Sequence, residues 1–183
     1  MNQEKIAAAT AMLLEALGED CTRPGLQETP QRVARMYTEF FKHQNDCVAT
    51  HLSKVFAVES QQLVVESDIV FHSLCEHHLL PFYGKVHIGY IPDGSVVGLS
   101  KLARTVEHFA GGLQIQERLT NEIAQAIMEH LQPQGVIVYV EAEHMCMTMR
   151  GVKKPGSKTT SMVCYGVFEE QNELIQQFLQ MIK

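Results

Sequence analysis

The chain has 183 residues, of which 45% are apolar and 20% are charged, and its formal net charge at pH 7 is −6. This length and composition predict one globular domain of ordinary size, or a small domain with a helical extension. The negative charge argues against nonspecific nucleic-acid binding, which needs a positive surface. No apolar run approaches the roughly 18 residues of a membrane span.

The amino terminus and the cysteines together predict a cytoplasmic location. Residues 1–5 lack the basic start and the apolar stretch of a secretory signal. The five cysteines are an odd number and are scattered along the chain. This pattern is typical of a reducing compartment and argues against a disulfide framework.

Residues 1–50 are predicted to form an N-terminal helical extension. Residues 4–17 are good helix formers with apolar residues at helical spacing. A second helix is expected from Thr29, an N-cap residue that is followed by proline at the first helical position. Residues 43–53 show no clear period and are interpreted as a linker.

Residues 51–183 are predicted to form the second domain, an α+β fold. The expected elements are strands at 63–71 and 85–91, helices at 100–110 and 114–131, strands at 136–149 and 160–168, and a terminal helix at 170–182. This order predicts an antiparallel sheet with two helices packed on one face. The second face and both edge strands would stay exposed, so the architecture favours homo-oligomerisation.

The basic residues of this acidic chain gather in small groups, which suggests a pocket for a small anion. The groups are Arg32 with Arg35, Lys101 with Arg104, and Arg150 with Lys153 and Lys154. Ser100 is a good N-cap, so the helix expected there would present free backbone N–H groups and its positive dipole end to an anion. Lys101 and Arg104 would add charge at the same helix end.

Two short motifs far apart in the sequence offer the ligands that zinc prefers. Residues 75–78 are Cys-Glu-His-His, and residues 144–146 are His-Met-Cys. One turn can direct Cys75 and His78 at the same point, and a strand would place His144 and Cys146 on one face. Three ligands with imidazoles to spare favour a catalytic zinc site with a coordination position open to water. A structural zinc site, or buried cysteines without metal, remain alternatives.

Five blocks of sequence occur in order and carry a resemblance to a known family: residues 29–34, 75–78, 98–101, 114–120 and 144–152. Over nearly the whole chain, the sequence resembles the zinc-dependent GTP cyclohydrolase I family. The resemblance implies the tunnelling fold, in which subunits pool their sheets into a barrel and pentameric rings stack into a homo-oligomer. It also implies hydrolysis of GTP to 7,8-dihydroneopterin triphosphate and formate, the entry to folate or tetrahydrobiopterin biosynthesis.

The resemblance assigns a role to each matching residue of the catalytic centre. It makes Cys75, His78 and Cys146 the ligands of Zn²⁺, and it gives His77 and His144 acid–base work on the purine ring. Histidine suits such work because its unperturbed pKa lies near 6.5. Ser100 is implied to contact the ribose during the later rearrangement.

The same resemblance assigns the contacts with GTP. Glu117 matches the carboxylate that holds guanine, with Gln116 lining the same pocket. The triphosphate contacts would come from Lys101, Arg104 and Arg150, and from Arg32 and Arg35 of a neighbouring subunit. A site built between subunits would leave a monomer inactive.

One departure and two alternatives accompany this interpretation. Residues 111–112 are Gly-Gly where the family usually carries at least one basic residue, which affects a subunit contact, the guanine site or both. One alternative is another tunnelling-fold pterin or deazapurine enzyme, and the other is a zinc-stabilised oligomer that binds a nucleotide without turnover. The motifs are compatible with the folate and the biopterin pathway alike, and with the presence or absence of a feedback-regulatory protein.

Overall fold

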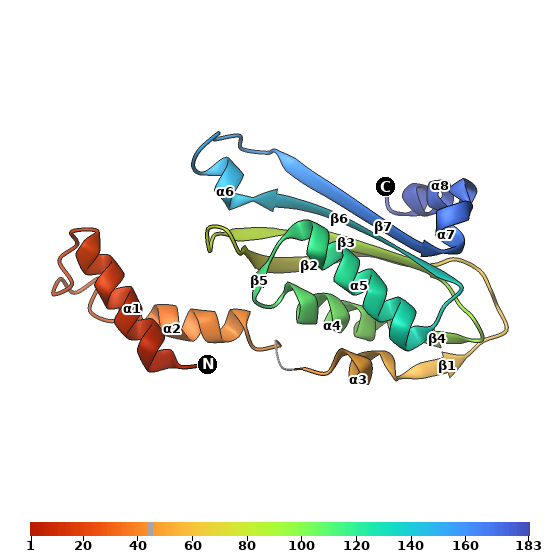
Figure 1. Ribbon diagram of the computed structural model, residues 1–183, viewed down its shortest axis with the longest axis horizontal. Helices are drawn as coiled ribbons and strands as arrows, with labels where there is room; N and C mark the ends of the chain where they lie inside the picture. The colour runs from red at the N-terminus through yellow and green to blue at the C-terminus, as the bar shows by residue number, and fades with distance from the viewer. Residues whose placement is uncertain (44–45) are drawn as a thin grey trace. The chain divides into compact units, whose positions relative to one another are not determined.

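A computed structural model of the chain describes residues 1–43 and 46–183 (Figure 1). The chain forms two compact units, Met1–Lys42 and His43–Lys183. Part of the predicted linker, residues 44–45, lies outside the described residues. No helix among the described residues is long and apolar enough to cross a membrane.

The first unit is a pair of helices, α1 (Gln3–Ala16) and α2 (Thr29–Phe40). The Asn2 side chain caps α1 by accepting a hydrogen bond from a backbone N–H of the first turn. Helix α2 starts where the sequence predicts, although Glu28 occupies the N-cap position and Thr29 is already helical. The two helices pack along each other, and Ala34 is buried between them.

The second unit contains every other described element (Figure 1). In chain order these are α3 (Val48–Leu52), β1 (Val55–Ala57), β2 (Val64–Cys75), β3 (Pro81–Ile91), β4 (Ser95–Val97), α4 (Leu99–Ala110), β5 (Leu113–Gln114), α5 (Gln116–Leu131), β6 (Gly135–His144), α6 (Met145–Thr148), β7 (Lys158–Gly166), α7 (Val167–Glu170) and α8 (Asn172–Met181). The main sheet has the order β5-β2-β3-β6-β7, and β1 pairs with β4 in a separate ribbon.

The main sheet confirms the predicted α+β plan, with one addition. Strands β2, β3, β6 and β7 pair antiparallel, as expected. The short strand β5 joins the edge in parallel, opposite Leu74 and Cys75 at the end of β2. That parallel pairing brings the start of α5 to the end of the sheet where β2 terminates.

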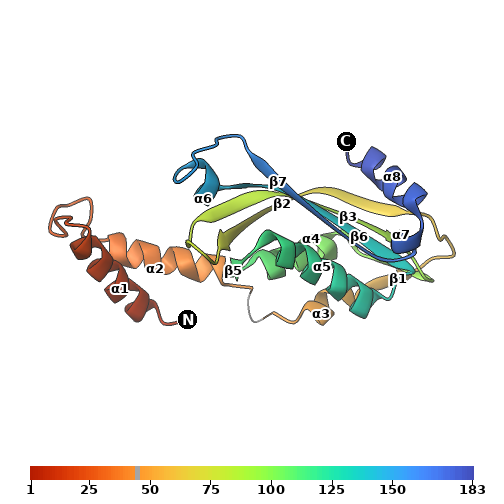
Figure 2. The same ribbon diagram turned by 45° about the horizontal axis from the view of Figure 1, so that its top comes forward.

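Helices α4 and α5 cover one face of the sheet and enclose the main core (Figure 2). Val86, Ile88 and Val138 of the sheet and Val106 and Ile123 of the helices are fully buried in this core. Full burial of such a side chain contributes about 1.5–3 kcal/mol, so this layer is the main source of stability.

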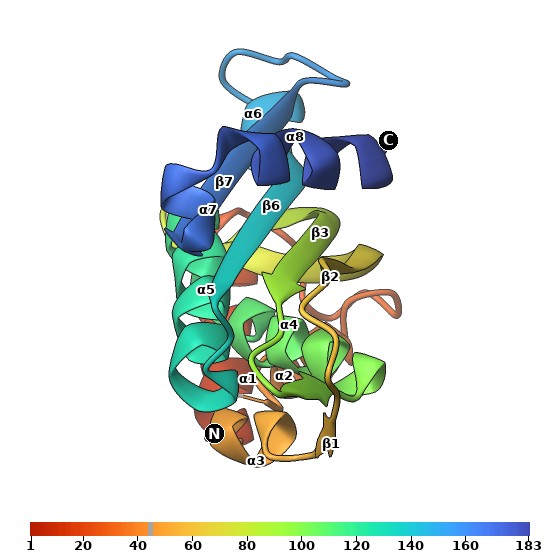
Figure 3. The same cartoon turned by 90° about the vertical axis from the view of Figure 1, so that its right-hand side faces the viewer.

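The opposite face of the sheet is partly covered, which corrects the expectation that it would be open. Helices α7 and α8 pack across one end of it (Figure 3). There Ile137, Phe168 and Phe178 are fully buried in a second cluster. Gly89 makes room for this contact, because a Cβ at that position would lie 2.7 Å from the Phe178 ring.

Three further local predictions were wrong. The predicted linker contains helix α3, held in place by Leu52, which is fully buried. The predicted strand 136–149 ends at His144 and continues as the helical turn α6. The predicted terminal helix is divided at Gln171 into α7 and α8.

Candidate active site

A tight turn fixes the first motif. Strand β2 ends at Cys75, whose N–H donates to the Leu80 carbonyl at 2.8 Å, and the Leu79 N–H donates back to the Cys75 carbonyl at 2.8 Å. The Glu76 N–H donates to the Gln114 carbonyl at 3.0 Å and so attaches the turn to β5. Leu79 has φ +55°, a left-handed conformation that reverses the chain before β3 begins.

Arg118 reinforces this turn through side-chain contacts that sequence reasoning missed. Its guanidinium donates to Glu76 Oε2 at 2.6 Å, to Gln114 Oε1 at 2.8 Å and to the Leu113 carbonyl at 3.0 Å. The fork geometry of arginine suits such a three-way contact. The match of residues 114–120 marked this region, but only the fold places Arg118 beside Glu76.

The second motif reaches the turn by a route that differs from the prediction. His144 is the last residue of β6, and Cys146 lies in the helical turn α6, where the Met149 N–H donates to the Met145 carbonyl at 3.1 Å. A helical turn advances about 100° per residue, so the two side chains do not share a strand face. Cys146 therefore joins Cys75, whereas His144 turns toward the start of α5.

The donor atoms of Cys75, His78 and Cys146 all lie within 4.8 Å of one another. Cys75 Sγ lies 4.0 Å from His78 Nδ1, close to the roughly 3.6 Å expected between sulfur and nitrogen ligands of a tetrahedral zinc ion. Burial, followed by the neighbouring Cys75, raises the pKa of the Cys146 thiol. A divalent cation between the two sulfurs would relieve this penalty, so the residues present fit a zinc ion.

His77 lies at the edge of this cluster without joining it. Its Nδ1 is 3.8 Å from Cys75 Sγ. The three residues whose donor atoms all lie within 4.8 Å of one another nevertheless include His78 and not His77. The His77 and His78 rings meet at 73° with centroids 6.2 Å apart. His77 is exposed, so a bound molecule could reach it.

His144 is held from two sides. Its ring stacks on Phe82, its register partner in β3, with centroids 4.7 Å apart and planes 2° apart. Its Nε2 lies 2.8 Å from the side-chain oxygen of Gln116, the first residue of α5. Burial lowers the pKa of His144, against an opposing effect of the Glu117 carboxylate. Glu117 itself is exposed in the first turn of α5.

The groups predicted to bind phosphate at α4 lie at the far end of that helix. Ser100 is not the N-cap, because α4 begins at Leu99 after Gly98, and the Lys101 N–H donates to the Gly98 carbonyl at 2.8 Å. Helix α4 ends two residues before β5, which pairs with β2 at Cys75. Ten residues of helix, about 15 Å, separate Ser100 from that end of α4 (Figure 1).

The remaining predicted cations are exposed. Arg150 follows α6, where its charge lowers the pKa of the Cys146 thiol as the weakest of several effects. In the first unit, Arg32 pairs with Glu28 at 2.9 Å, and Arg35 is exposed on the same helix.

The glycine pair between α4 and β5 has a structural reason at one of its two positions. Gly111 is the C-cap of α4. Gly112 adopts φ +105°, a conformation that L side chains rarely adopt. Glycine at position 112 therefore turns the chain from α4 into β5, which leads to the start of α5.

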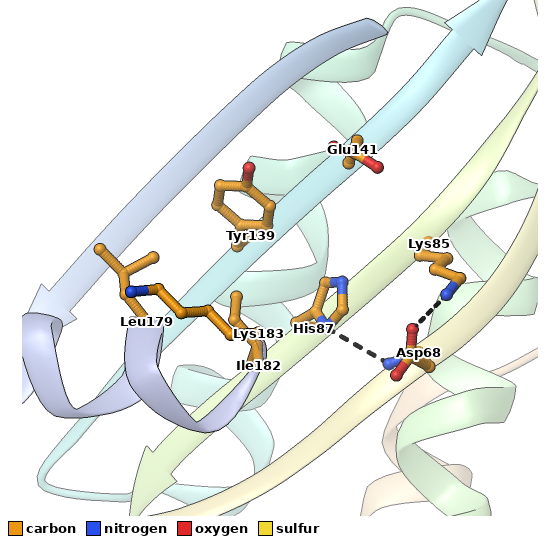
Figure 4. A pocket seen from close by; sticks show the side chains of 8 residues that line it. All are labelled: Asp68, Lys85, His87, Tyr139, Glu141, Leu179, Ile182 and Lys183. Atoms are coloured by element: carbon orange, nitrogen blue, oxygen red, sulfur yellow. Dashed lines mark hydrogen bonds and ion pairs between the residues drawn. The ribbon is translucent and has the colours of Figure 1, made fainter.

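A cavity lies on the opposite face of the sheet (Figure 4). It measures about 370 Å³ and lies between the sheet and the end of α8. His87 is 6% exposed there, and its Nδ1 accepts a hydrogen bond from the Asp68 N–H at 3.3 Å. Burial lowers the pKa of His87, against the opposing charge of Asp68. Lys85, which forms an ion pair with Asp68, adds a smaller lowering effect, and Glu141 a weaker opposing one.

The family model described as GTP cyclohydrolase I matches residues 6–183. The chain belongs to the GTP cyclohydrolase I family. Curated relatives named GTP cyclohydrolase 1 agree with this assignment. The Clostridium kluyveri protein is 56% identical over 183 residues, covering 100% of this chain and 99% of the relative. The Streptococcus sanguinis protein is 58% identical over 174 residues, covering 95% of each chain, and the Clostridium perfringens protein is 57% identical over 182 residues, covering 100% and 98%.

A solved structure supports the fold of this GTP cyclohydrolase I family member. The archaeosine synthase QueF-Like, in the apo form, superposes with a TM-score of 0.50 at 19% identity. The match covers 59% of this chain and 97% of that chain. At this identity the likeness concerns the fold alone, and it agrees with the predicted tunnelling fold.

Proposed function

We propose that this protein hydrolyses GTP to 7,8-dihydroneopterin triphosphate and formate, the first step of folate or tetrahydrobiopterin biosynthesis. The observation that carries the proposal is the Cys75, His78 and Cys146 cluster, which forms in a chain that matches the GTP cyclohydrolase I family over residues 6–183. Opening the imidazole ring of guanine requires water activation at one carbon and proton transfer to the adjacent nitrogen. Thiol and imidazole ligands beside further imidazoles meet both requirements.

Zinc is the cofactor that we propose for this cluster. Cys75, His78 and Cys146 would hold it, and two sulfur ligands with one nitrogen ligand leave a fourth position free in a tetrahedral site. When bound, zinc supplies Lewis-acid activation of water near neutral pH. All five cysteines are free, so the Cys75 and Cys146 thiols are available as ligands, and free thiols are typical of the predicted cytoplasmic location.

The residues around the cluster have separate roles in the proposed reaction. His77 is exposed beside Cys75 and exchanges protons with the purine ring, and His144 does the same from the end of β6. Glu117 accepts hydrogen bonds from the guanine N–H groups. Ser100 contacts the ribose, and Lys101, Arg104 and Arg150 bind the triphosphate through charge-assisted hydrogen bonds.

The position of α4 supports a site that is shared between copies of the chain. Lys101 and Arg104 lie at the start of α4, whereas the other end of this helix leads to Cys75 of the proposed zinc site. Because the two groups are a helix length apart in one copy, a neighbouring copy would supply Lys101 and Arg104 to the GTP bound at this zinc site. Strand β7 and the greater part of β2 form opposite edges of the sheet and are available for pairing into a ring. Residues 1–50 would then be an extension that delivers Arg32 and Arg35 to a neighbour, with residues 51–183 as the catalytic domain and stacked pentameric rings as the assembly.

The proposal is tested by incubating the zinc-loaded protein with GTP and following formate and 7,8-dihydroneopterin triphosphate together. Equal amounts of both products are expected, with loss of both on chelation and recovery on adding zinc back. Binding of GTP without formate release by the zinc-loaded oligomer would contradict the proposal and favour a nucleotide-binding protein without turnover.

A further inference from the structure

A buried hydrogen-bond network joins the start of α5 to the end of β6. Gln116 is 1% exposed, and its side-chain nitrogen lies 3.1 Å from the Val140 carbonyl, 3.0 Å from the Thr159 carbonyl and 3.1 Å from Ser161 Oγ. Its side-chain oxygen lies 2.8 Å from His144 Nε2. The amide is thus surrounded by protein on both sides.

The partners of Gln116 fix which way its amide points. Backbone carbonyls only accept hydrogen bonds, so the group that faces Val140 and Thr159 must be the NH₂ group. In the reversed orientation an oxygen would meet two carbonyl oxygens in a buried place, at the cost of unmade hydrogen bonds. The side-chain oxygen of Gln116 therefore faces His144 and acts as an acceptor.

The hydroxyl groups of the network agree with this orientation. Thr120 Oγ1 donates to the Gln116 carbonyl at 2.7 Å, which uses its single hydrogen. Ser161 Oγ lies 2.6 Å from Thr120 Oγ1 and must then be the donor in that pair. Its lone pairs remain free to accept from the Gln116 NH₂ group, whose two hydrogens face three acceptors: the Val140 and Thr159 carbonyls and Ser161 Oγ.

We propose that Gln116 is a positioning residue for His144: its side-chain oxygen fixes the proton of the neutral imidazole on Nε2 and holds the orientation of the ring. An acceptor opposite Nε2 requires an N–H at that atom, and a neutral imidazole carries only one N–H. The hydrogen bond to Gln116 therefore selects the Nε2–H tautomer of His144.

Phe82 supplies the second constraint on the ring. It is fully buried and stacks on His144 with planes 2° apart, which opposes tilting of the imidazole while Gln116 opposes rotation within the plane. The catalytic part of the inference rests on the proposed function, and the tautomer does not. The inference pairs the Gln116 side chain with His144, whereas the family resemblance implied that Gln116 lines the guanine pocket.

The direct test is heteronuclear NMR of the full-length, zinc-loaded protein labelled at the histidine nitrogens. The His144 signals are assigned by their loss in His144→Gln. Neutral His144 is expected as the Nε2–H tautomer in the wild type and in Ser161→Ala, which alters the network without touching the Gln116 oxygen. In Gln116→Met, which has similar volume and no amide, the signals are expected to shift toward a mixture of tautomers. A wild-type His144 protonated at Nδ1 would overturn the inference, whether or not Gln116→Met folds.

Steady-state kinetics supply a second readout. Gln116→Met is expected to lower kcat about 100-fold while KM for GTP changes less than about threefold, because general acid–base catalysis is lost and substrate binding is not. A raised KM with unchanged kcat would instead assign Gln116 to GTP binding and overturn the positioning role. A wild type that releases no formate contradicts the proposed function alone, since the tautomer measurement needs no turnover.

Discussion

The two ends of helix α4 differ in what they carry. At its carboxyl end, the chain continues into β5 and α5, which border the turn with Cys75 and His78, and Arg118 holds that turn through three hydrogen bonds. At its amino end, Lys101 and Arg104 begin the helix beside His51 of α3. One end is ordered for metal chemistry, and the other concentrates positive charge.

This difference indicates how two copies of a small chain can together bind the two ends of GTP. The metal cluster and its imidazoles come from a single chain, so their geometry is set by the fold of one copy. In the proposed function, Lys101 and Arg104 of α4 bind the triphosphate of GTP, and they lie a helix length away from the cluster in the same copy. Assembly would then bring the charged end of one copy to the metal end of another, and the following variants test each end separately.

The largest effect is expected at the metal end. Cys146→Ala should lower GTP turnover at least about 1,000-fold, since the several kcal/mol that a catalytic metal supplies are lost and each 1.36 kcal/mol is tenfold in rate. Cys164→Ala is the matched control, because Cys164 is half-buried in β7, away from the cluster. Zinc content and formate release are measured for both. Full activity in Cys146→Ala would exclude the cluster as the catalytic site.

The second prediction concerns the order of the metal end. Arg118→Met should weaken zinc binding about 10- to 100-fold, the usual cost of losing an interaction that orients a metal ligand. The measurement is competition for zinc with a chelator of known affinity. Arg23→Met is the control, since Arg23 forms only an exposed ion pair with Glu19 in the first unit. Equal zinc affinity in the Arg118 variant and the wild type would show that the turn is ordered without the hydrogen bonds of Arg118.

The charged end of α4 should show a smaller effect of a different kind. Arg104→Ala is expected to raise KM for GTP about tenfold, because hydrogen bonds to charged groups contribute about 1.5–3 kcal/mol, while zinc content stays unchanged. Lys85→Ala removes a lysine from the opposite sheet face and should leave KM unchanged. Lost zinc in Arg104→Ala would contradict the separation of the two ends.

The smallest effect lies away from both ends, at His87. Burial lowers its pKa below the unfolded value of about 6.5, so at lower pH the unfolded chain binds more protons than the native one. This contribution to stability is constant above that value and falls below it, by at most about 1.4 kcal/mol per pH unit. Denaturation of His87→Gln between pH 7 and 5 should show a shallower loss, and His72→Gln, exposed on the same face, should match the wild type. If the free energy of unfolding fell equally with pH in all three proteins, the lowered pKa of His87 would be refuted.

The sequence alone predicted the fold class, and it failed where long-range contacts decide local structure. The family resemblance predicted Cys75, His78 and Cys146 as metal ligands, and the structure brings their donor atoms together. The α6 turn was missed, because a four-residue helix is too short to show a helical period.

The contacts of His144 were also out of reach of sequence reasoning. Gln116 lies 28 residues away in sequence, and Phe82 meets His144 only through the register of β3 and β6. Residue types and motifs say which side chains are present near a site, whereas strand register and helix start decide which of them touch. For the same reason, the contact between Arg118 and Glu76 could not be predicted from the sequence.

The most direct test of a shared site is complementation between two variants that each have little turnover at low GTP. Cys146→Ala lacks the metal end, and the double variant Lys101→Ala, Arg104→Ala lacks the charged end of α4. Co-assembled in equal amounts and assayed at low GTP, they should recover about a quarter of wild-type turnover, because a head-to-tail interface combines an intact half from each chain in one site of four. Turnover no higher than that of the separate variants would show that the metal ligands and the α4 cations of one site come from the same copy, and would contradict a site shared between copies.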